Sequence, residues 1–149
     1  MINEDLKLRG DVAIVLKDKN GNVKESREIN NLVVTAGLTF ICARMAAASA
    51  DVMSHMALGS GTTAAAAGDT DLESILGSRE ALDSSTASAN TIAYVSSFEA
   101  GEGTGAVTEA GIFNAATSGT MLCRTVFAVV NKAADDTMSV TWTITLTAS

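Results

Sequence analysis

From Met138 to Leu146 the chain reads M-S-V-T-W-T-I-T-L, in which apolar and hydroxyl-bearing side chains alternate. A period of two is typical of a strand with one buried face and one solvated face. From Met121 to Val130 it reads M-L-C-R-T-V-F-A-V-V, again rich in β-branched and aromatic residues. The polar stretch from Asn131 to Thr137 has the length of a connection. We therefore predict two paired antiparallel strands, to which the rest of the chain adds further strands.

The N-terminal part, residues 1–30, reads as a hairpin with a charged face. Leu6–Leu16 alternates and then runs apolar, which predicts one long strand or two strands broken near Gly10. Asn20-Gly21 is a strong signal for a tight hairpin turn, because both central positions of a type I′ turn need positive φ. The return strand is predicted over Val23–Ile29, with charges alternating outward.

One helix is predicted over residues 35–48, with Thr35 as its N-terminal cap. Apolar side chains recur there at spacings of three and four, which gives one apolar stripe; they are Leu38, Ile41, Cys42 and Met45.

Further short strands are expected over Leu32–Val34, Val52–Gly59, Arg79–Leu82, Thr91–Phe98 and Val107–Phe113. A short helical turn closed by Gly77 is expected after Asp69 or Thr70, and residues 83–90 read as a polar connection. Strands at a spacing of roughly 8–12 residues are typical of a sandwich. We predict a mainly β fold: an antiparallel β-sandwich, jelly-roll-like, with one helix packed on it, formed by residues 1–149 as a single domain.

Composition narrows the classes of function. The 149 residues carry a formal net charge of −7 and only 18% charged residues. An acidic chain without a basic cluster does not suit nucleic-acid binding, and no apolar run approaches the ~20 residues that span a bilayer. The chain has one Trp, one Tyr and four Phe. A core this poor in aromatic residues favours burial against neighbouring copies, as a homo-oligomer such as a dimer or a trimer.

Cys42 and Cys123 lie far apart, each in an apolar run, and read as two free buried thiols rather than a disulfide or a metal site. One His and two Cys are too few for a structural zinc site. We expect no metal and no cofactor.

Two motifs suggest catalysis or nucleotide binding at first sight. Gly101–Gly105 resembles a phosphate loop, but it lacks the Gly-Lys-Ser/Thr ending and a helix that follows. Gly59-Ser60-Gly61 resembles part of a nucleophile elbow. The only histidine, His55, would have to reach Ser60 and be oriented by a third group.

Carboxylates suggest two further kinds of site. Glu99, Glu102 and Glu109 would supply a pair for glycoside cleavage, but the aromatic platforms are missing, since Tyr94 and Trp142 read as core. Two candidate calcium sites are Asp69-Thr70-Asp71 and Asp135-Asp136, yet neither has the regularly spaced oxygen ligands of a calcium-binding loop. Both read as solvated turns, and we expect no enzyme.

Glu109 is the most informative single charge, because it lies within an apolar strand. A buried carboxylate needs a partner. Arg124, on the neighbouring predicted strand, is the first candidate for a structural ion pair that fixes strand register, and Arg79 is the alternative.

Four strings, in this order, resemble small structural proteins of tailed-bacteriophage virions. They are Asn31–Leu38 (N-L-V-V-T-A-G-L), Met56–Ala64 (M-A-L-G-S-G-T-T-A), Val107–Ala115 (V-T-E-A-G-I-F-N-A) and Gly119–Arg124 (G-T-M-L-C-R), followed by the strand that holds Trp142. The resemblance covers about residues 31 to 146. One departure is Ala64–Ala67, where related loops often carry proline after Gly-Thr-Thr.

This resemblance implies a β-rich virion component without catalytic activity, made in the host cytoplasm. The first expectation is a capsid decoration, or cement, protein that binds the major capsid protein at the head surface and stabilises its lattice. A short chain favours this role, because a fibre is usually longer and repetitive. The alternatives are a tail, baseplate or fibre component and, third, a glycan-binding module on the virion surface.

Overall fold

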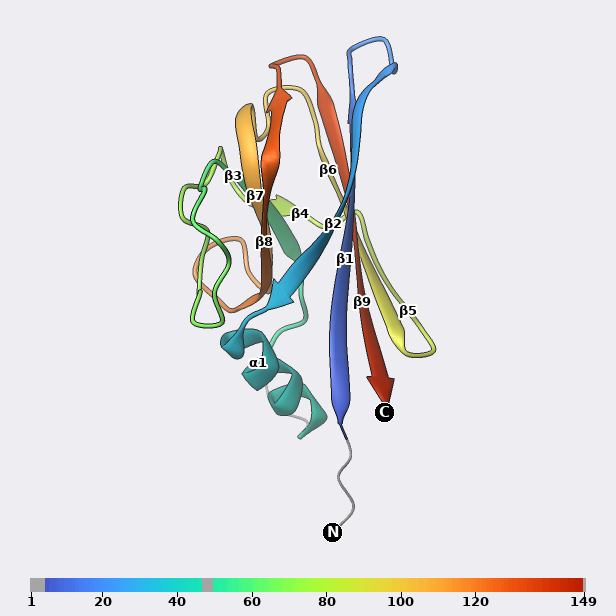
Figure 1. Ribbon diagram of the computed structural model, residues 1–149, viewed down its shortest axis with the longest axis vertical. Coiled ribbons are helices and arrows are strands. Elements are labelled where there is room, and N and C mark those ends of the chain that lie inside the picture. The colour runs from blue at the N-terminus through green and yellow to red at the C-terminus, as the bar shows by residue number, and fades with distance from the viewer. Residues whose placement is uncertain (1–4, 47–49, 149) are drawn as a thin grey trace.

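The computed structural model describes residues 5–46 and 50–148. Within these residues the chain forms one helix, too short to cross a membrane, and nine strands (Figure 1). The elements are β1 (Leu6–Lys17), β2 (Val23–Val33), α1 (Thr35–Met45), β3 (His55–Gly59), β4 (Glu80–Ala81), β5 (Ser84–Ser88), β6 (Thr91–Phe98), β7 (Gly105–Phe113), β8 (Met121–Lys132) and β9 (Thr137–Ala148).

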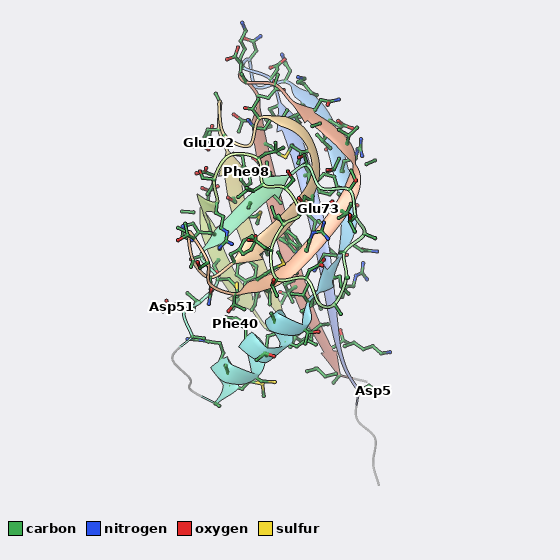
Figure 2. The ribbon with its side chains drawn as sticks, turned by 90° about the vertical axis from the view of Figure 1, so that its left-hand side faces the viewer. Asp5, Phe40, Asp51, Glu73, Phe98 and Glu102 are labelled. Carbon is green, nitrogen blue, oxygen red and sulfur yellow. The ribbon has the colours of Figure 1, made fainter. Side chains whose placement is uncertain are left out.

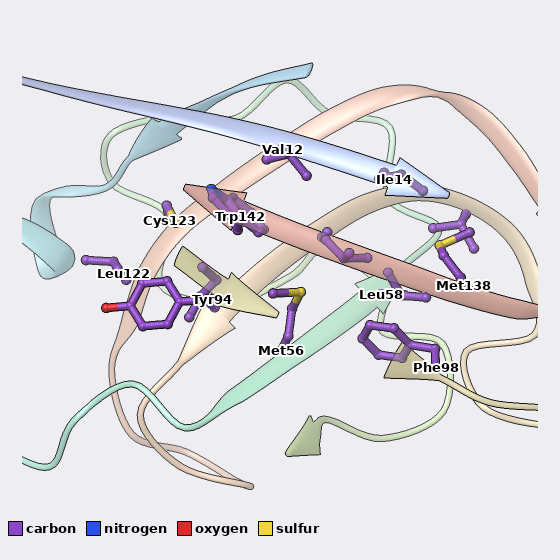
Figure 3. Packing of buried hydrophobic residues seen from close by; sticks show 14 of the residues in the cluster. Val12, Ile14, Met56, Leu58, Tyr94, Phe98, Leu122, Cys123, Met138 and Trp142 are labelled. Carbon is purple, nitrogen blue, oxygen red and sulfur yellow. The ribbon is translucent and has the colours of Figure 1, made fainter. Parts of the chain in front are cut away.

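The strands form one curled sheet in the order β4-β3-β7-β8-β2-β1-β9-β6-β5, and every pairing is antiparallel. Its two halves face each other, and the core between them combines Trp142 and Phe98 from one half with Met56 and Leu58 from the other (Figure 3). The predicted antiparallel, mainly β class with one helix is confirmed. A jelly-roll-like sandwich stays a prediction.

The two end strands of the sheet, β4 and β5, are consecutive in the chain. β4 pairs with β3 at one edge, and β5 pairs with β6 at the other. Only Leu82 and Asp83 separate them, and their backbone N–H groups donate to Ser54 O (2.9 Å) and Val95 O (2.7 Å), one on each side. The residues predicted as a polar connection thus include a strand, and residues 80–88 bring the two edges of the sheet together.

The predicted hairpin of the last two long strands is wrong. β8 pairs with β7 and, at Leu32 and Val33, with β2, whereas β9 lies between β1 and β6. β9 matches β1 along its whole length, from Leu6↔Ala148 to Lys17↔Thr137, so neither of its edges is left for β8. The connection of residues 133–136 crosses from one half of the sheet to the other.

The N-terminal hairpin forms, with Gly21 at φ +82° in its turn. β1 runs through Gly10 without a break, and β2 continues to Val33. The charges of the return strand alternate between its faces: Lys24 and Glu28 are exposed, whereas Glu25 and Arg27 are half-buried. Arg27 pairs with Ile14 and so shares its inward face, where it forms an ion pair with Glu25. β2 pairs with β8 only at Leu32 and Val33, so most of this edge of β2 has no neighbouring strand. Inward-pointing charges at such an edge discourage it from pairing with other chains.

Helix α1 begins at Thr35, and Val34 holds the cap position without a side-chain cap, so Thr35 does not play the predicted role. The predicted end falls at residue 48, and residues 47 and 48 lie outside the described part of the chain. Of the predicted stripe only Ile41 packs against the core, whereas Leu38 is 43% and Met45 82% exposed. Gly37 explains this, because a Cβ there would lie 2.2 Å from Leu122 O, so α1 approaches β8 at this residue.

The helix therefore turns Phe40 and Ile41 toward the core. Cys42 is exposed, which corrects the prediction of two buried thiols, whereas Cys123 is buried and both are free.

Candidate functional site

The loop Ser60–Arg79, called loop 60–79 below, lies over the outer face of β3 and β7 (Figure 2). The predicted helical turn before Gly77 does not form. Leu72 packs instead into a small apolar cluster with Ala57 and Phe113. Gly111 leaves room for this contact, since a Cβ there would lie 3.1 Å from Leu72 Cδ2. The loop is thus packed onto the sheet.

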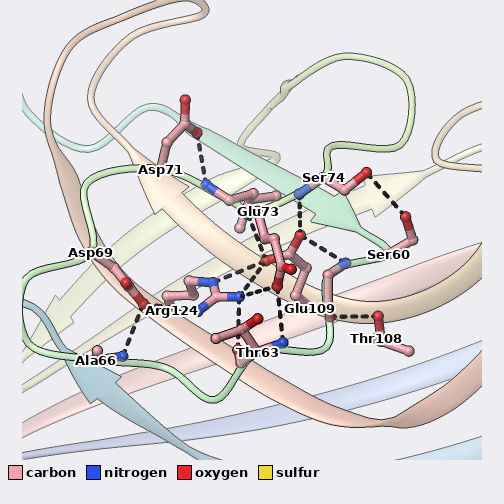
Figure 4. A network of polar contacts seen from close by, with 12 residues as sticks. Ser60, Thr63, Ala66, Asp69, Asp71, Glu73, Ser74, Thr108, Glu109 and Arg124 are labelled. Carbon is pink, nitrogen blue, oxygen red and sulfur yellow. Dashed lines mark hydrogen bonds and ion pairs between the residues drawn. The ribbon is translucent and has the colours of Figure 1, made fainter.

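The carboxylate of Glu109, on β7, holds loop 60–79 from the side that faces the sheet. Oε1 accepts hydrogen bonds from the backbone N–H groups of Gly61 (3.0 Å) and Ser74 (2.8 Å). Oε2 accepts from the backbone N–H of Glu73 (3.1 Å) and from Arg124 Nε (2.9 Å). Glu109 is fully buried. Its charge is tolerated there because three backbone N–H donors and the cation of Arg124 surround it (Figure 4).

Arg124 extends the network to the other side of the loop. Its Nη1 donates to Asp69 Oδ2 (2.8 Å), and its Nη2 donates to Thr63 O (3.0 Å). Burial alone would lower the pKa of Arg124, but hydrogen bonds to Asp69 and Glu109 outweigh it and raise the pKa. The guanidinium therefore stays charged; it donates to two carboxylates and one carbonyl, and it also lies 3.7 Å from Glu73 Oε2.

The outer carboxylates of the network are held ionised as well. The backbone N–H of Ala66 donates to Asp69 and lowers its pKa, and Arg124 acts in the same direction. The backbone N–H of Thr63 lowers the pKa of Glu73 in the same way.

The structure thus brings together Glu109 and Arg124, the pair singled out in the sequence. Arg79, the alternative partner, lies elsewhere: its guanidinium is 3.6 Å from the ring centroid of Phe113, and it donates to Ala115 O and Ser118 O. Arg79 holds the β7–β8 turn rather than the carboxylate of Glu109.

The glycines of Gly59-Ser60-Gly61 serve close packing. A Cβ at Gly59 or Gly61 would stand 2.5 or 2.6 Å from Glu109 Oε1. Ser60 Oγ donates to Ser74 Oγ at 3.3 Å, whereas His55 Nδ1 lies 2.8 Å from Ser54 Oγ. His55 begins β3 and Ser60 follows its end, so about 16 Å separates them at roughly 3.3 Å per residue. The structure does not bring the Ser–His pair together.

Nor does the structure gather the other candidate groups. Gly101–Gly105 forms the β6–β7 turn, where Gly101 N donates to Ala134 O (2.8 Å) and Glu99 N to Glu102 Oε2 (2.8 Å). Glu109 lies under loop 60–79 and bonds to that loop and to Arg124, not to Glu99 or Glu102. Within residues 5–46 and 50–148, no three His, Cys, Asp or Glu residues are placed to hold a metal ion.

One buried cation was missed in the sequence. Lys132 is 2% exposed, and its Nζ donates to Glu99 O at 2.9 Å. Burial lowers its pKa, and the nearby carboxylates of Asp136 and Glu102 oppose this shift. Asp136 in turn forms an ion pair with Lys24 at 2.7 Å. A lysine at the end of an apolar strand is the one signal that the sequence offered.

Comparisons of the chain with protein-family models, curated proteins and solved structures found no match. The network itself shows what its residues do. Its ionised groups bind one another and the backbone of the loop, so the arrangement is suited to holding a surface loop in one shape.

Proposed function

We propose that this chain is a structural protein of a tailed-bacteriophage virion, most specifically a capsid decoration protein. It binds the major capsid protein at the head surface and stabilises the capsid lattice, as a dimer or a trimer. In this proposal the facing halves of the curled sheet are the layers of a jelly-roll-like β-sandwich.

One observation carries the proposal: the four strings that resemble virion proteins meet in one structural unit. Met56–Ala64 contributes β3 and the start of loop 60–79, Val107–Ala115 contributes Glu109, and Gly119–Arg124 contributes Arg124. Asn31–Leu38 joins them, since Thr35 N donates to Ala67 O at 2.8 Å. The resemblance therefore rests on residues that build one scaffold.

The scaffold gives the proposal a physical basis. A loop that is already ordered loses little conformational entropy on binding, which favours association. Loop 60–79 presents small exposed side chains, including Ala64 and Ala66, on its outer surface. Many identical copies on a capsid would then bind through modest interfaces, because multivalency adds to each.

Co-sedimentation of purified protein with expanded heads, and separately with isolated tails, tests the proposal. We expect saturable binding to heads at a fixed ratio to the major capsid protein. Binding to tails alone would assign the chain to the tail, baseplate or fibre class. Binding to neither would contradict both and favour a glycan screen.

A pair of variants tests the contact surface. Ala64→Arg places a long cation on loop 60–79 and should weaken head binding. Ala100→Arg places the same side chain in the β6–β7 turn, also exposed, and should bind as wild type does. Equal binding by both variants would remove loop 60–79 from the interface while leaving the decoration role to the first experiment.

A further inference from the structure

A cavity of about 540 Å³ opens between α1, the β5–β6 hairpin and the ends of β8 and β9. Its walls are mostly apolar and include Phe40, Ile41, Ile92, Leu122, Ile144 and Leu146. Small-molecule sites are typically apolar cavities of this size, with a few polar groups that orient the ligand. The polar groups of the cavity therefore decide what it would bind.

Tyr94 supplies the first polar group. Its side chain lines the cavity and is 6% exposed, yet its hydroxyl has no hydrogen-bond partner among the described residues. Figure 3 shows this hydroxyl turned away from Met56 and toward Leu122, which also lines the cavity. Burial raises the pKa of Tyr94 to about 12, so the hydroxyl keeps its proton at neutral pH. The hydroxyl is not among the buried polar atoms that lack a partner, so it reaches the open side of the cavity and is free to donate to an acceptor on a ligand.

Arg44 supplies the second polar group. It lies in the last turn of α1, lines the cavity and donates from Nη1 to Ala50 O at 2.8 Å. No carboxylate in the described part of the chain forms an ion pair with it, and no acidic side chain lines the cavity there. In a chain of net charge −7, this leaves one local positive site beside an apolar cavity.

We propose that the cavity binds a small anionic amphiphile. Its apolar chain packs between α1 and the β5–β6 hairpin, and its anionic head accepts a hydrogen bond from the Tyr94 hydroxyl in the field of Arg44. This inference is independent of the proposed role in the capsid.

Isothermal titration of the full chain with decanoate, below its micelle-forming concentration, tests the site, with decanol as a neutral probe of equal chain length. We expect one saturable site for decanoate and weaker binding of decanol. Tyr94→Phe, which removes only the hydroxyl, should weaken decanoate binding about fivefold. Arg44→Gln should weaken it about threefold, and added salt should reduce that difference.

Two variants complete the design. Ala87→Phe adds bulk at the wall on the exposed strand β5 and should abolish binding while leaving the circular dichroism spectrum unchanged. Lys19→Gln removes a cation at the distant tip of the β1–β2 hairpin and should change nothing.

Three results would overturn the proposal. The first is the absence of saturable decanoate binding. The second is that decanoate and decanol bind with equal affinity and that Tyr94→Phe does not change this affinity. The third is that the chain forms a dimer, which Ala87→Phe disrupts. The last would show that a second copy of the chain covers the cavity, whose lining includes the exposed side chains of Met45 and Val52.

Discussion

The side chain of Asn31 occupies the space that a side chain at Gly10 would need. Its Oδ1 lies 1.2 Å from the position of a Cβ on Gly10, directly across the β1–β2 pairing. Both polar atoms of this carboxamide are buried without a hydrogen-bond partner in the described residues. The effects of substitutions at Gly10 and Asn31 on stability should therefore depend on each other.

This coupling predicts a non-additive pair of substitutions. Gly10→Ala should lower the free energy of unfolding by about 1–3 kcal/mol, because the added methyl group overlaps Asn31. Asn31→Ala should leave stability unchanged or raise it, since burying an unpaired polar group costs about 1–3 kcal/mol. In the double variant most of the Gly10→Ala loss should disappear. Urea unfolding measures all four proteins, and strictly additive losses would contradict the coupling.

Glu109→Ala should lower the free energy of unfolding by about 3–5 kcal/mol, because it leaves Arg124 and three backbone N–H groups of loop 60–79 without this acceptor. Glu28→Ala, at an exposed site, should change it by less than about 0.5 kcal/mol. Hydrogen exchange gives a second readout: the amides of Gly61 and Ser74 should be protected in wild type and exchange quickly in Glu109→Ala. A melting temperature equal to that of wild type would refute the structural role.

Acid should destabilise the fold through the outer carboxylates of the network. Asp69 and Glu73 have pKa values below their ordinary 3.8 and 4.5, because backbone N–H groups and then Arg124 stabilise the charged forms. An acid whose pKa is lowered by folding stabilises the fold above its unfolded pKa, and this contribution is lost as pH falls through the folded pKa.

The free energy of unfolding should therefore decline as pH falls below about 4.5, the ordinary value for Glu73. Asp69→Asn should flatten this decline, which urea unfolding between acidic and neutral pH would measure. The slope is not expected to vanish, since Asp18 and Asp136 also have lowered pKa values. An unchanged slope in Asp69→Asn would exclude its contribution.

The two cysteines should differ sharply in reactivity. Cys42 is exposed on α1, whereas Cys123 is buried and its burial raises the pKa of the thiol. Since the thiolate is the reactive form, a disulfide reagent should label one thiol quickly and the second only on unfolding. Cys42→Ser should remove the fast phase alone. Two fast thiols in the native chain would contradict the burial of Cys123.

The alternation of side chains was enough to locate most strands. In β9, Met138, Val140, Trp142 and Ile144 are all buried, as their spacing indicates. The partners of the strands could not be read in this way. A short polar connection favours a local hairpin, but β9 pairs with β1 along its full length, and that choice depends on residues more than a hundred positions away.

Two further features could not be predicted from the sequence: the face of α1 that is buried, and the way in which loop 60–79 is held. Apolar spacing placed Leu38 and Met45 inward, but Gly37 decides which side of the helix approaches β8. Glu109 stood out because a charge within an apolar strand needs a partner. Its main partners are backbone N–H groups, which carry no sequence signature, and only Gly59 and Gly61 hinted at the close approach.

Because β4 and β5 are consecutive in the chain, the backbone links the two end strands of the curled sheet and closes it. A force that pulls its halves apart meets a covalent chain, because Leu82 and Asp83 tie one rim to the other. Opening the sheet at this seam would require one rim strand to peel away from its neighbour, β4 from β3 or β5 from β6. Two residues of backbone thus limit how far the two end strands can separate, and a longer link at Leu82 and Asp83 should loosen the sheet at this point without altering the core.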